Sequence, residues 1–438
     1  MEHETHHPHK EKQLENPHTS TDNATKPHDL WQEVKDYFQQ FRWSNLMKHI
    51  DLPTIAIVIG LIIFGLIMVF SASMYIALKN AGSGPLQVTY TQSVSIVLGF
   101  ILFVVIFLIP TNFYREPNII LIVNIIMVLL LLATRFFGLE EGGAKSWLRI
   151  GGFSLQASEL AKIVTVVTWI WISDYSNREF RLSKELFKHG ISRRMMIIAL
   201  SLLSLLLIAL QPDYGMFFII IGSICLMWLI DNASQRINMG IYGFLIIGYG
   251  LFRALASHYS EALISTEYHF FERIGIFINP FIDPANKGYQ SINGYVAFSR
   301  GGFFGVGLGQ GLMKRGQIPA INNDFIIANI AEEIGFVGVM LLMTVYFILF
   351  FRLLKWSAKC HNPYRSRMIL GLTTILMIQT FVNVGGVMGI IPMTGVTLPL
   401  ISAGGSSMII TLMTLAIILK MIYEDQYEQE LLMTSEVK

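Results

Sequence analysis

Long apolar runs dominate this sequence. Several of them reach the roughly 20 residues that a helix needs to cross a bilayer. Of the 438 residues, 53% are hydrophobic and only 14% are charged. A segment in lipid must satisfy its backbone polar groups internally, and a helix does so within one segment. The sequence therefore predicts an all-α, polytopic membrane protein. The net charge of +2 gives no reason to expect a nucleic-acid partner.

We expect about ten transmembrane helices. Hydropathy places them near 53–76, 88–110, 118–138, 157–173, 195–211, 215–231, 237–257, 326–351, 367–390 and 405–423. Between the seventh and eighth helices lies a long segment, 258–325, which is rich in Gly and Pro. Loops of this kind tend to carry function when a rigid bundle positions them.

The chain outside these helices divides by composition. Residues 1–29 are polar and His-rich, which predicts a disordered tail. At 30–50, apolar residues recur near the helical period between charged ones, so we expect an amphipathic helix on the membrane surface. The membrane domain itself spans 51–423, and 424–438 is a second tail.

Basic residues set the orientation. They cluster in two loops, 178–194 and 352–367, which lie on the same side of a ten-helix bundle. The positive-inside rule makes that side cytoplasmic, and both termini with it. Four segments then face outward, and all the unusual polar motifs lie in them: 139–156, 211–213, 258–325 and 391–404.

Glu159 and Lys162 are three residues apart, so they lie on nearly the same face of a helix. An acid and a base within a span usually pair inside the bundle. The pair fits a functional site and equally a structural tie between helices. Ser158, just before Glu159, is expected to cap the helix. Trp147 fits both a site residue and an interfacial anchor.

The Gly-dense stretch Gly288–Gly338 contains Asp324, at the point where loop is expected to become helix. Glu332 and Glu333 then lie about 12 Å further along that helix, where they need cations, water or protonation. This stretch fits either a reactive carboxylate or a re-entrant glycine loop with a helix cap. The segment 389–407 contains helix-breaking Pro and Gly residues, so we expect it to line a cavity.

These motifs, at their spacings, resemble the SEDS family (shape, elongation, division and sporulation proteins). The resemblance to these FtsW/RodA/SpoVE-like proteins covers about 51–423 and is closer to the FtsW branch than to RodA. The motifs that carry it are GGAKSW (142–147), QASELAK (156–162), QPDYG (211–215), GYQ (288–290), AFSRGGFFGVGLG (297–309), NNDFIIANIAEEIGF (322–336) and PMTGVTLPLISAGGSS (392–407). The Asp, Glu, Lys and Trp positions of the family's motifs are kept. The departures are Ala157, Arg300, Asn322, Asn323, Thr397 and Ala403.

The resemblance implies a peptidoglycan glycosyltransferase. It would polymerise lipid II, a lipid-linked disaccharide-peptide, at the outer face of the bacterial cytoplasmic membrane during division or cell-shape maintenance. Asp324 would be the catalytic base, because a sugar hydroxyl is a poor nucleophile at neutral pH. Lys162, Lys145 and Arg273, in that order, would neutralise the leaving undecaprenyl pyrophosphate, with Glu159 positioning Lys162. The predicted substrate-binding set is completed by Trp147, Gln290, Glu332 and Ser406.

No metal-ligating residues are predicted, and Cys225 and Cys360 suggest neither a disulfide framework nor a metal site. A divalent cation, Mg²⁺ or Mn²⁺, at the pyrophosphate remains open. The expected partners are a class B penicillin-binding protein and other membrane proteins of the divisome or elongasome. Two other functions stay open: a lipid II flippase, since buried charges and broken helices suit a transporter, and a non-catalytic scaffold that recruits a transpeptidase.

Overall fold

The computed structural model describes residues 48–79, 86–141, 144–150, 153–179, 193–232, 235–266 and 268–436. The predicted tail at 1–29 and nearly all of the predicted surface helix at 30–50 lie outside these residues. Ten long helices are described: α3 (Leu52–Lys79), α4 (Gln87–Leu108), α5 (Pro117–Phe137), α6 (Ala157–Glu179), α7 (Arg193–Leu210), α8 (Tyr214–Asn232), α9 (Gln235–His258), α13 (Ile326–Lys359), α14 (Pro363–Val387) and α15 (Gly405–Glu436).

Each of the ten segments predicted to span the membrane is helical. Among the described helices, eight are long and apolar enough to cross a bilayer, and the exceptions are α6 and α8. The helical membrane class is therefore confirmed, while the count of ten crossings stays a prediction. The last helix continues as far as Glu436, well past the predicted end at 423.

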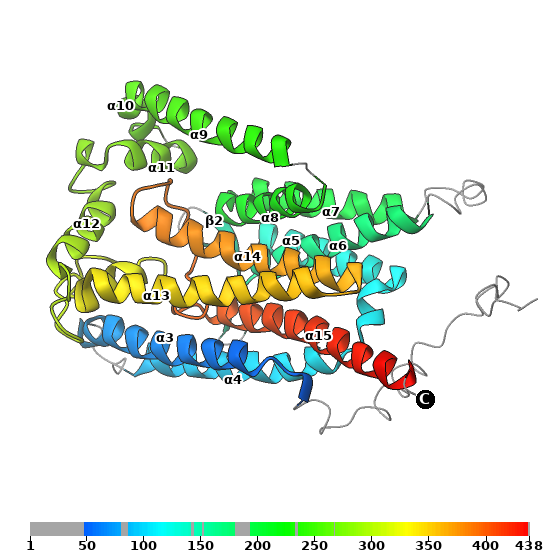
Figure 1. The fold of residues 1–438 in the computed structure, drawn as a ribbon. Coiled ribbons are helices and arrows are strands. Elements are labelled where there is room, and N and C mark those ends of the chain that lie inside the picture. Colours follow the sequence, from blue (N-terminus) through cyan, green and yellow to red (C-terminus); the bar gives the residue numbers. More distant parts are fainter. Residues whose placement is uncertain are drawn as a thin grey trace, which may run out of the picture. The chain divides into compact units, whose positions relative to one another are not determined.

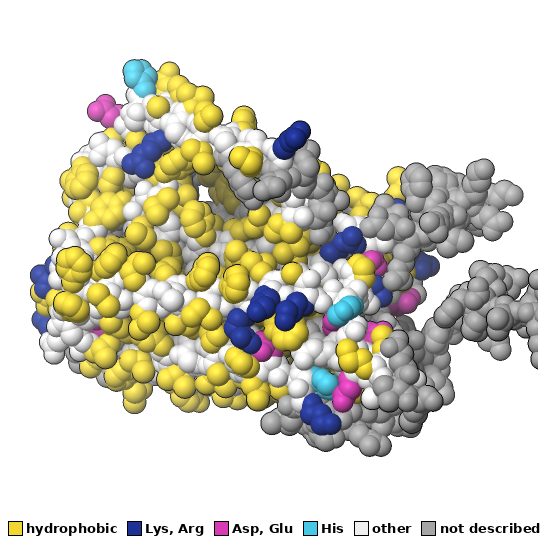
Figure 2. Space-filling model, in the orientation of Figure 1, with side chains coloured by type: hydrophobic (Ala, Val, Ile, Leu, Met, Phe, Trp, Pro, Cys, Tyr) yellow, Lys and Arg dark blue, Asp and Glu magenta, His cyan; other side chains and the backbone are white. Residues whose placement is uncertain are grey.

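The centre of the bundle is formed by α14 and α15, whose apolar windows are 78% and 89% buried. Figure 1 shows α13, α14 and α15 running side by side, with α3 and α4 along one edge. On the other side α14 packs against α6 and α8, and α5 packs against α6 and α7. Figure 2 shows the outer surface of α3 and α13 covered by apolar side chains, as expected for helices that face lipid.

The segment 139–156, which we predicted to be an external loop, forms a small antiparallel sheet. Its strands are β1 (Leu139–Glu141), β2 (Ala144–Ile150) and β3 (Phe153–Gln156), in the order β1-β2-β3. Trp147 pairs with Gln156 across β2 and β3. Short strands between two helices carry a weak hydropathy signal, so the prediction missed them. The sheet fixes the backbone that leads directly into α6.

The long segment after α9 is also built from short helices. They are α10 (Ser260–Ile264), α11 (His269–Ile278), the 3-10 turn η3 (Pro280–Ile282) and α12 (Tyr289–Gly301). A glycine-rich loop, 302–325, follows α12. It leads into α13 at Ile326, as the sequence predicted.

Helix α13 is broken at Gly335, whose φ of +78° only glycine adopts without strain. The break leaves backbone groups of α13 without partners inside the helix, and backbone groups of the glycine-rich loop bond to them instead. Val306 N donates to Glu332 O at 2.9 Å, and Phe336 N donates to Gly302 O at 2.9 Å. A Cβ on Gly335 would lie 2.3 Å from the Gly305 nitrogen, so glycines on both sides permit this close approach.

Cations accompany the two glutamates beside the break, which is one of the three possibilities that the sequence left open. Arg300 Nε lies 3.0 Å from Glu332, and Lys314 Nζ lies 2.6 Å from Glu333. Both carboxylates also accept backbone N–H groups of the glycine-rich loop, from Gly309 to Glu333 and from Leu312 and Met313 to Glu332. The glutamate pair thus fastens the loop to α13.

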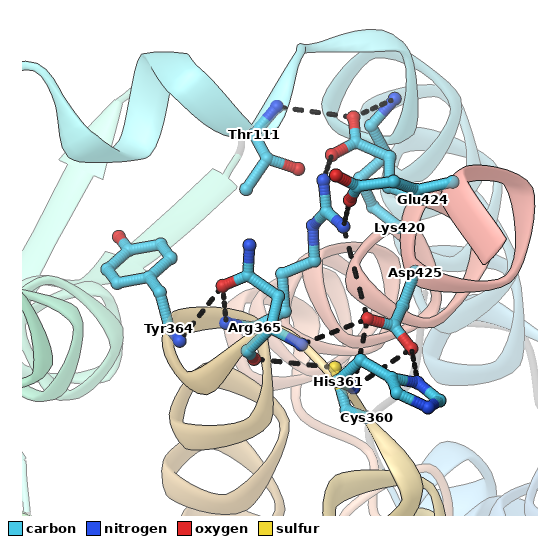
Figure 3. A network of polar contacts seen from close by, with 10 residues as sticks. Thr111, Cys360, His361, Tyr364, Arg365, Lys420, Glu424 and Asp425 are labelled. Carbon is cyan, nitrogen blue, oxygen red and sulfur yellow. Dashed lines mark hydrogen bonds and ion pairs between the residues drawn. The ribbon is translucent and has the colours of Figure 1, made fainter. Parts of the chain in front are cut away.

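The opposite end of the bundle is held by a polar network between α14, α15 and the 3-10 turn η1 (Thr111–Arg115) (Figure 3). Arg365, near the start of α14, lies 2.5 Å from Glu428 and 3.5 Å from Glu424 on α15. Glu424 also pairs with Lys420 at 3.1 Å and accepts the backbone N–H of Thr111. These contacts tie three elements together at the predicted cytoplasmic face.

Candidate active site

A cavity of about 430 Å³ lies where all four predicted external segments meet. The sheet contributes Trp147 and Gln156, and the turn between α7 and α8 contributes Asp213. The remaining walls come from α11, α12, the end of the glycine-rich loop and the segment before α15. Their lining side chains include His269, Glu272, Arg273, Lys287, Gln290, Ser291, Tyr295, Asn323, Asp324, Met393 and Thr394.

Asp324 is held in this cavity through its backbone. The side-chain amide of Asn383 on α14 donates hydrogen bonds to Asp324 O at 2.8 Å and to Val396 O at 2.7 Å. Ser402 Oγ donates to Asn323 O at 2.7 Å. These bonds join the two loops on either side of the site. The Asp324 side chain faces Gly395, where an added Cβ would lie 3.7 Å from Oδ2.

Burial raises the pKa of the Asp324 carboxyl to about 6. The backbone N–H groups of Asp324 and Phe325 and the charge of Arg273 pull that pKa down and limit the rise. Such a carboxylate is largely ionised at neutral pH and is a stronger base than a solvated aspartate. Its Oδ1 atom is buried and accepts no hydrogen bond from the described residues. Because Asp324 also lines the cavity, its carboxylate can accept a proton from a ligand bound there.

Asp213 is a second carboxylate of the cavity, but both of its oxygens already accept hydrogen bonds from the protein. Its Oδ2 accepts from Ser158 Oγ at 2.5 Å and from Gln156 Nε2 at 2.9 Å, and Oδ1 accepts from Met216 N at 3.4 Å. Burial raises its pKa, and the bonds from Ser158, Gln156 and Met216 oppose that rise. Ser158 was predicted to cap α6. That prediction was wrong, because α6 begins at Ala157 and the Ser158 hydroxyl points to Asp213.

Four of the predicted site residues line the cavity together: Trp147, Arg273, Gln290 and Asp324. Arg273 also donates to Met393 O at 3.5 Å, which links α11 to the segment before α15. Lys145 lies on β2, two residues from Trp147, and does not line the cavity.

Glu159 and Lys162 form the predicted pair, with Lys162 Nζ 2.5 Å from Glu159 Oε2. Both side chains are fully buried behind the cavity wall. Lys162 also donates to Gln379 Oε1 at 2.6 Å, and Gln379 donates to Thr397 O at 3.1 Å. The pair therefore supports the segment that carries Thr397.

Glu332 and Ser406 also lie outside the cavity lining. Glu332 is occupied by Arg300 and by the backbone of the glycine-rich loop. Ser406 Oγ accepts the backbone N–H of Gln156 at 3.4 Å and so joins α15 to the sheet. In this structure both residues shape the site without facing it.

Several cavity residues were not predicted from the sequence. Ser291 and Tyr295 lie four residues apart on α12, so the helical period links them to each other, and Ser291 directly follows the Gln290 that we selected. Lys287 and His269 follow only from the tertiary packing, since no local pattern brings α11 and the start of α12 together.

The described residues contain no group of three or more His, Cys, Asp or Glu side chains placed to hold a metal ion. Asp324 and Asp213 could supply single carboxylate ligands. A hard cation such as Mg²⁺ is commonly held by one or two carboxylates together with substrate phosphates and water. The cavity fits that limited form of metal binding.

The fold and the cavity define a multi-pass helical membrane protein with a polar site at one end of the bundle. The model of the FtsW/RodA/SpoVE family, described as cell cycle protein, matches residues 52–427. The chain belongs to this family.

Curated relatives agree with that assignment. The chain is 33% identical over 381 residues to the probable peptidoglycan glycosyltransferase FtsW of Bacillus subtilis, covering 86% of this chain and 91% of that protein. It is 30% identical over 410 residues to the protein of the same name from Legionella pneumophila, covering 93% and 98%.

Solved structures share the fold. One, described as "Structural coordination of polymerization and crosslinking by a peptidoglycan synthase complex", aligns with a TM-score of 0.61 at 25% identity, over 86% of this chain and 98% of that chain. The rod shape determining protein RodA of Thermus thermophilus aligns with a TM-score of 0.56 at 22% identity, over the same shares, and supports the fold alone.

Proposed function

We propose that this protein is a peptidoglycan glycosyltransferase of the FtsW type that polymerises lipid II. The observation that carries the proposal is Asp324, a buried carboxylate with a raised pKa that faces a polar cavity beside Arg273. The names of the curated relatives support the same activity. Membership of the family supports a role in cell division, with cell-shape maintenance as the related role.

In this reaction Asp324 takes the proton of the acceptor's sugar 4-hydroxyl. The hydroxyl oxygen forms a bond to the anomeric carbon of the donor. The bond from that carbon to undecaprenyl pyrophosphate breaks, and the leaving pyrophosphate takes the electron pair. Positioned bases of this kind typically contribute about 10²–10⁴-fold in rate.

Negative charge develops on the leaving pyrophosphate, and fixed cations stabilise it most effectively. Arg273 and Lys287 both line the cavity, so we assign this role to them. Lys162 and Lys145 do not line it. Lys162 acts indirectly, because its contact with Gln379 supports the segment at Thr397 that packs behind the site.

A divalent cation would supplement Arg273 and Lys287. When bound it would supply positive charge at the pyrophosphate, held by substrate oxygens and by Asp324 or Asp213. The steps above depend only on residues of the chain.

The cavity faces outward in our proposed orientation, with both termini in the cytoplasm. The basic residues between Arg352 and Arg367, at the opposite end of the bundle, support this orientation. It matches the chemistry, because glycan strands are assembled outside the cytoplasmic membrane.

We propose a class B penicillin-binding protein as the partner, within a divisome or elongasome. The structural neighbour described as a peptidoglycan synthase complex, in which polymerisation and crosslinking are coordinated, supports this partner. Affinity purification from native membranes in mild detergent tests the proposal. Recovery of the chain without any such protein would contradict it.

The direct test is polymerisation of lipid II by purified protein, with and without the partner. Asp324→Asn keeps the size of the side chain and removes the base, so glycan synthesis should fall by about 100-fold or more. Its thermal melting should match that of the unmodified protein. Asp324→Asn activity within a few-fold of the unmodified protein would exclude Asp324 as the base. Translocation of lipid II without polymerisation by the unmodified protein would favour a flippase.

A further inference from the structure

The tip of the glycine-rich loop exposes large apolar side chains. Phe303 is 71% exposed, Phe304 82% and Leu308 60%, and beside them Phe336 on α13 is 57% exposed. The rings of Phe303 and Phe336 contact each other edge-on, with centroids 6.1 Å apart. Clustered exposed apolar groups of this size mark an interaction surface rather than a face in water.

The height of this tip along the bundle is fixed. Phe336 N donates to Gly302 O at 2.9 Å, and Val337 N donates to Phe303 O at 3.0 Å. The tip is thus bonded to α13 directly after Gly335, the tenth residue of that helix. It does not extend freely from the end of the bundle.

Two polar ties between α3 and α13 mark the edges of the apolar layer. At one end Arg352 lies 2.5 Å from Asp51, and at the other Ser71 Oγ donates to Glu333 at 2.7 Å. Asp51 and Ser71 are 20 positions apart and Glu333 and Arg352 are 19 apart. At about 1.5 Å per residue these intervals span about 30 Å and about 29 Å.

This separation equals the thickness of the hydrocarbon core of a bilayer, about 30 Å. Between the ties α13 carries no charged residue from Ile334 to Phe351. Figure 2 shows apolar side chains along α13 as far as the basic cluster at its other end. The tie at Glu333 therefore lies at the outer boundary of the core, and the loop tip lies at the same level.

We infer that Phe303, Phe304, Leu308 and Phe336 form an interfacial anchor that inserts into the outer leaflet of the membrane. Aromatic side chains are enriched at this depth in membrane proteins. The occupant is lipid, because the anchor continues the lipid-facing surface of α13 without a break in its apolar character. Asp324 then stands about 12 Å above the boundary, beyond a headgroup layer that is roughly 5–8 Å thick.

The anchor fixes the height of the cavity above the hydrocarbon core of the membrane. A pyrophosphate attached to a membrane-embedded prenyl chain lies among the headgroups, and the sugar next to it lies at the level of Asp324. The anchor itself does not depend on the proposed reaction, so it is tested without an activity assay.

The experiment measures depth in the full-length protein, reconstituted in phosphatidylcholine vesicles after Cys225→Ala and Cys360→Ser. A small fluorescent label is attached to Phe304→Cys, and separately to Leu308→Cys as a second reporter of the anchor. Two controls are Arg315→Cys, which is exposed in the same loop, and Phe347→Cys, which is 67% exposed and 11 residues beyond Phe336 on α13.

Lipids that carry a nitroxide near the headgroup should quench the labels at 304 and 308 at least twofold more than aqueous iodide does. The label at 347 should respond most to a nitroxide deep in the acyl chain, and the label at 315 should respond most to iodide. Quenching of 304 and 308 by iodide, as at 315, would overturn the inference. Shielding that develops only after a penicillin-binding protein is added would also overturn it and would assign the tip to protein docking.

Discussion

The pH dependence of glycan synthesis should follow the ionisation of Asp324. This residue must be a carboxylate to accept a proton, so activity is present above its pKa and is lost as pH falls through it. With a pKa of about 6, the ionised fraction is about 90% at pH 7 and about 10% at pH 5. We therefore expect kcat/KM to fall about tenfold between pH 7 and pH 5, with its midpoint near 6.

Arg273→Gln provides the perturbation. The charge of Arg273 lowers the pKa of Asp324, so its removal moves the midpoint to higher pH. Arg273→Lys keeps a positive charge and should leave the midpoint near that of the unmodified protein. If Arg273 also neutralises the pyrophosphate, Arg273→Gln will have a lower plateau at high pH as well as a shifted midpoint.

The assay is initial-rate polymerisation of lipid II from pH 5 to pH 9, in a mixed buffer at constant ionic strength. Asp213→Asn is the control, because burial also raises the pKa of Asp213 and that group could produce a similar profile. The reasoning is refuted if Arg273→Gln leaves the midpoint unchanged. It is equally refuted if Asp213→Asn abolishes the acid limb while synthesis continues.

Three further predictions concern the framework of the site. Loss of either Glu159 or Lys162 leaves a buried charge, so Glu159→Gln and Lys162→Met should each destabilise the folded protein by about 3–5 kcal/mol. The double variant should lose much less than the sum of the two single losses. Additive losses of stability in denaturant titrations would disprove the coupling. Gly335→Ala should lower the melting temperature, because its Cβ would lie 2.3 Å from Gly305 N. Gly60→Ala, with open space around the added Cβ, should not lower it. Equal melting temperatures of the two variants would contradict the close packing of the glycine-rich loop against the break in α13. In a cysteine-free background, Asn286→Cys should react with an impermeant reagent added outside, and reaction only from the cytoplasmic side would reverse the topology.

The sequence predicted the helices well because hydropathy is a local property. Each apolar run of membrane-spanning length is a helix in the structure, since lipid leaves the backbone no other partner. Topology then predicted that the external motifs share one end of the bundle. The family resemblance selected Trp147, Arg273, Gln290 and Asp324, and the structure places all four around one cavity although they are distant in sequence.

Hydropathy and topology could not show which polar residues face the cavity and which lie behind its wall. Lys162 was expected to meet the substrate, yet its second partner is Gln379, 217 positions away, which places the amine behind the wall. Arg300 was noted as a departure from the family pattern, which left open how closely substrate contacts follow the family. In the structure Arg300 pairs with Glu332. Such assignments depend on which helices pack together, and a single sequence does not encode that locally.

The glycine-rich stretch illustrates how a chemical motif and a structural one can share a segment. Its glycines let the loop backbone pack against the break in α13, and Glu332 and Glu333 on α13 accept hydrogen bonds from the backbone of the same loop. Asp324 follows at the end of the same loop, so the insertion that satisfies the broken helix also places the proposed base. A change in the loop far from the cavity should therefore reach the reaction through the position of Asp324. This accounts for a proposed base that has few side-chain partners but whose backbone is held from both sides.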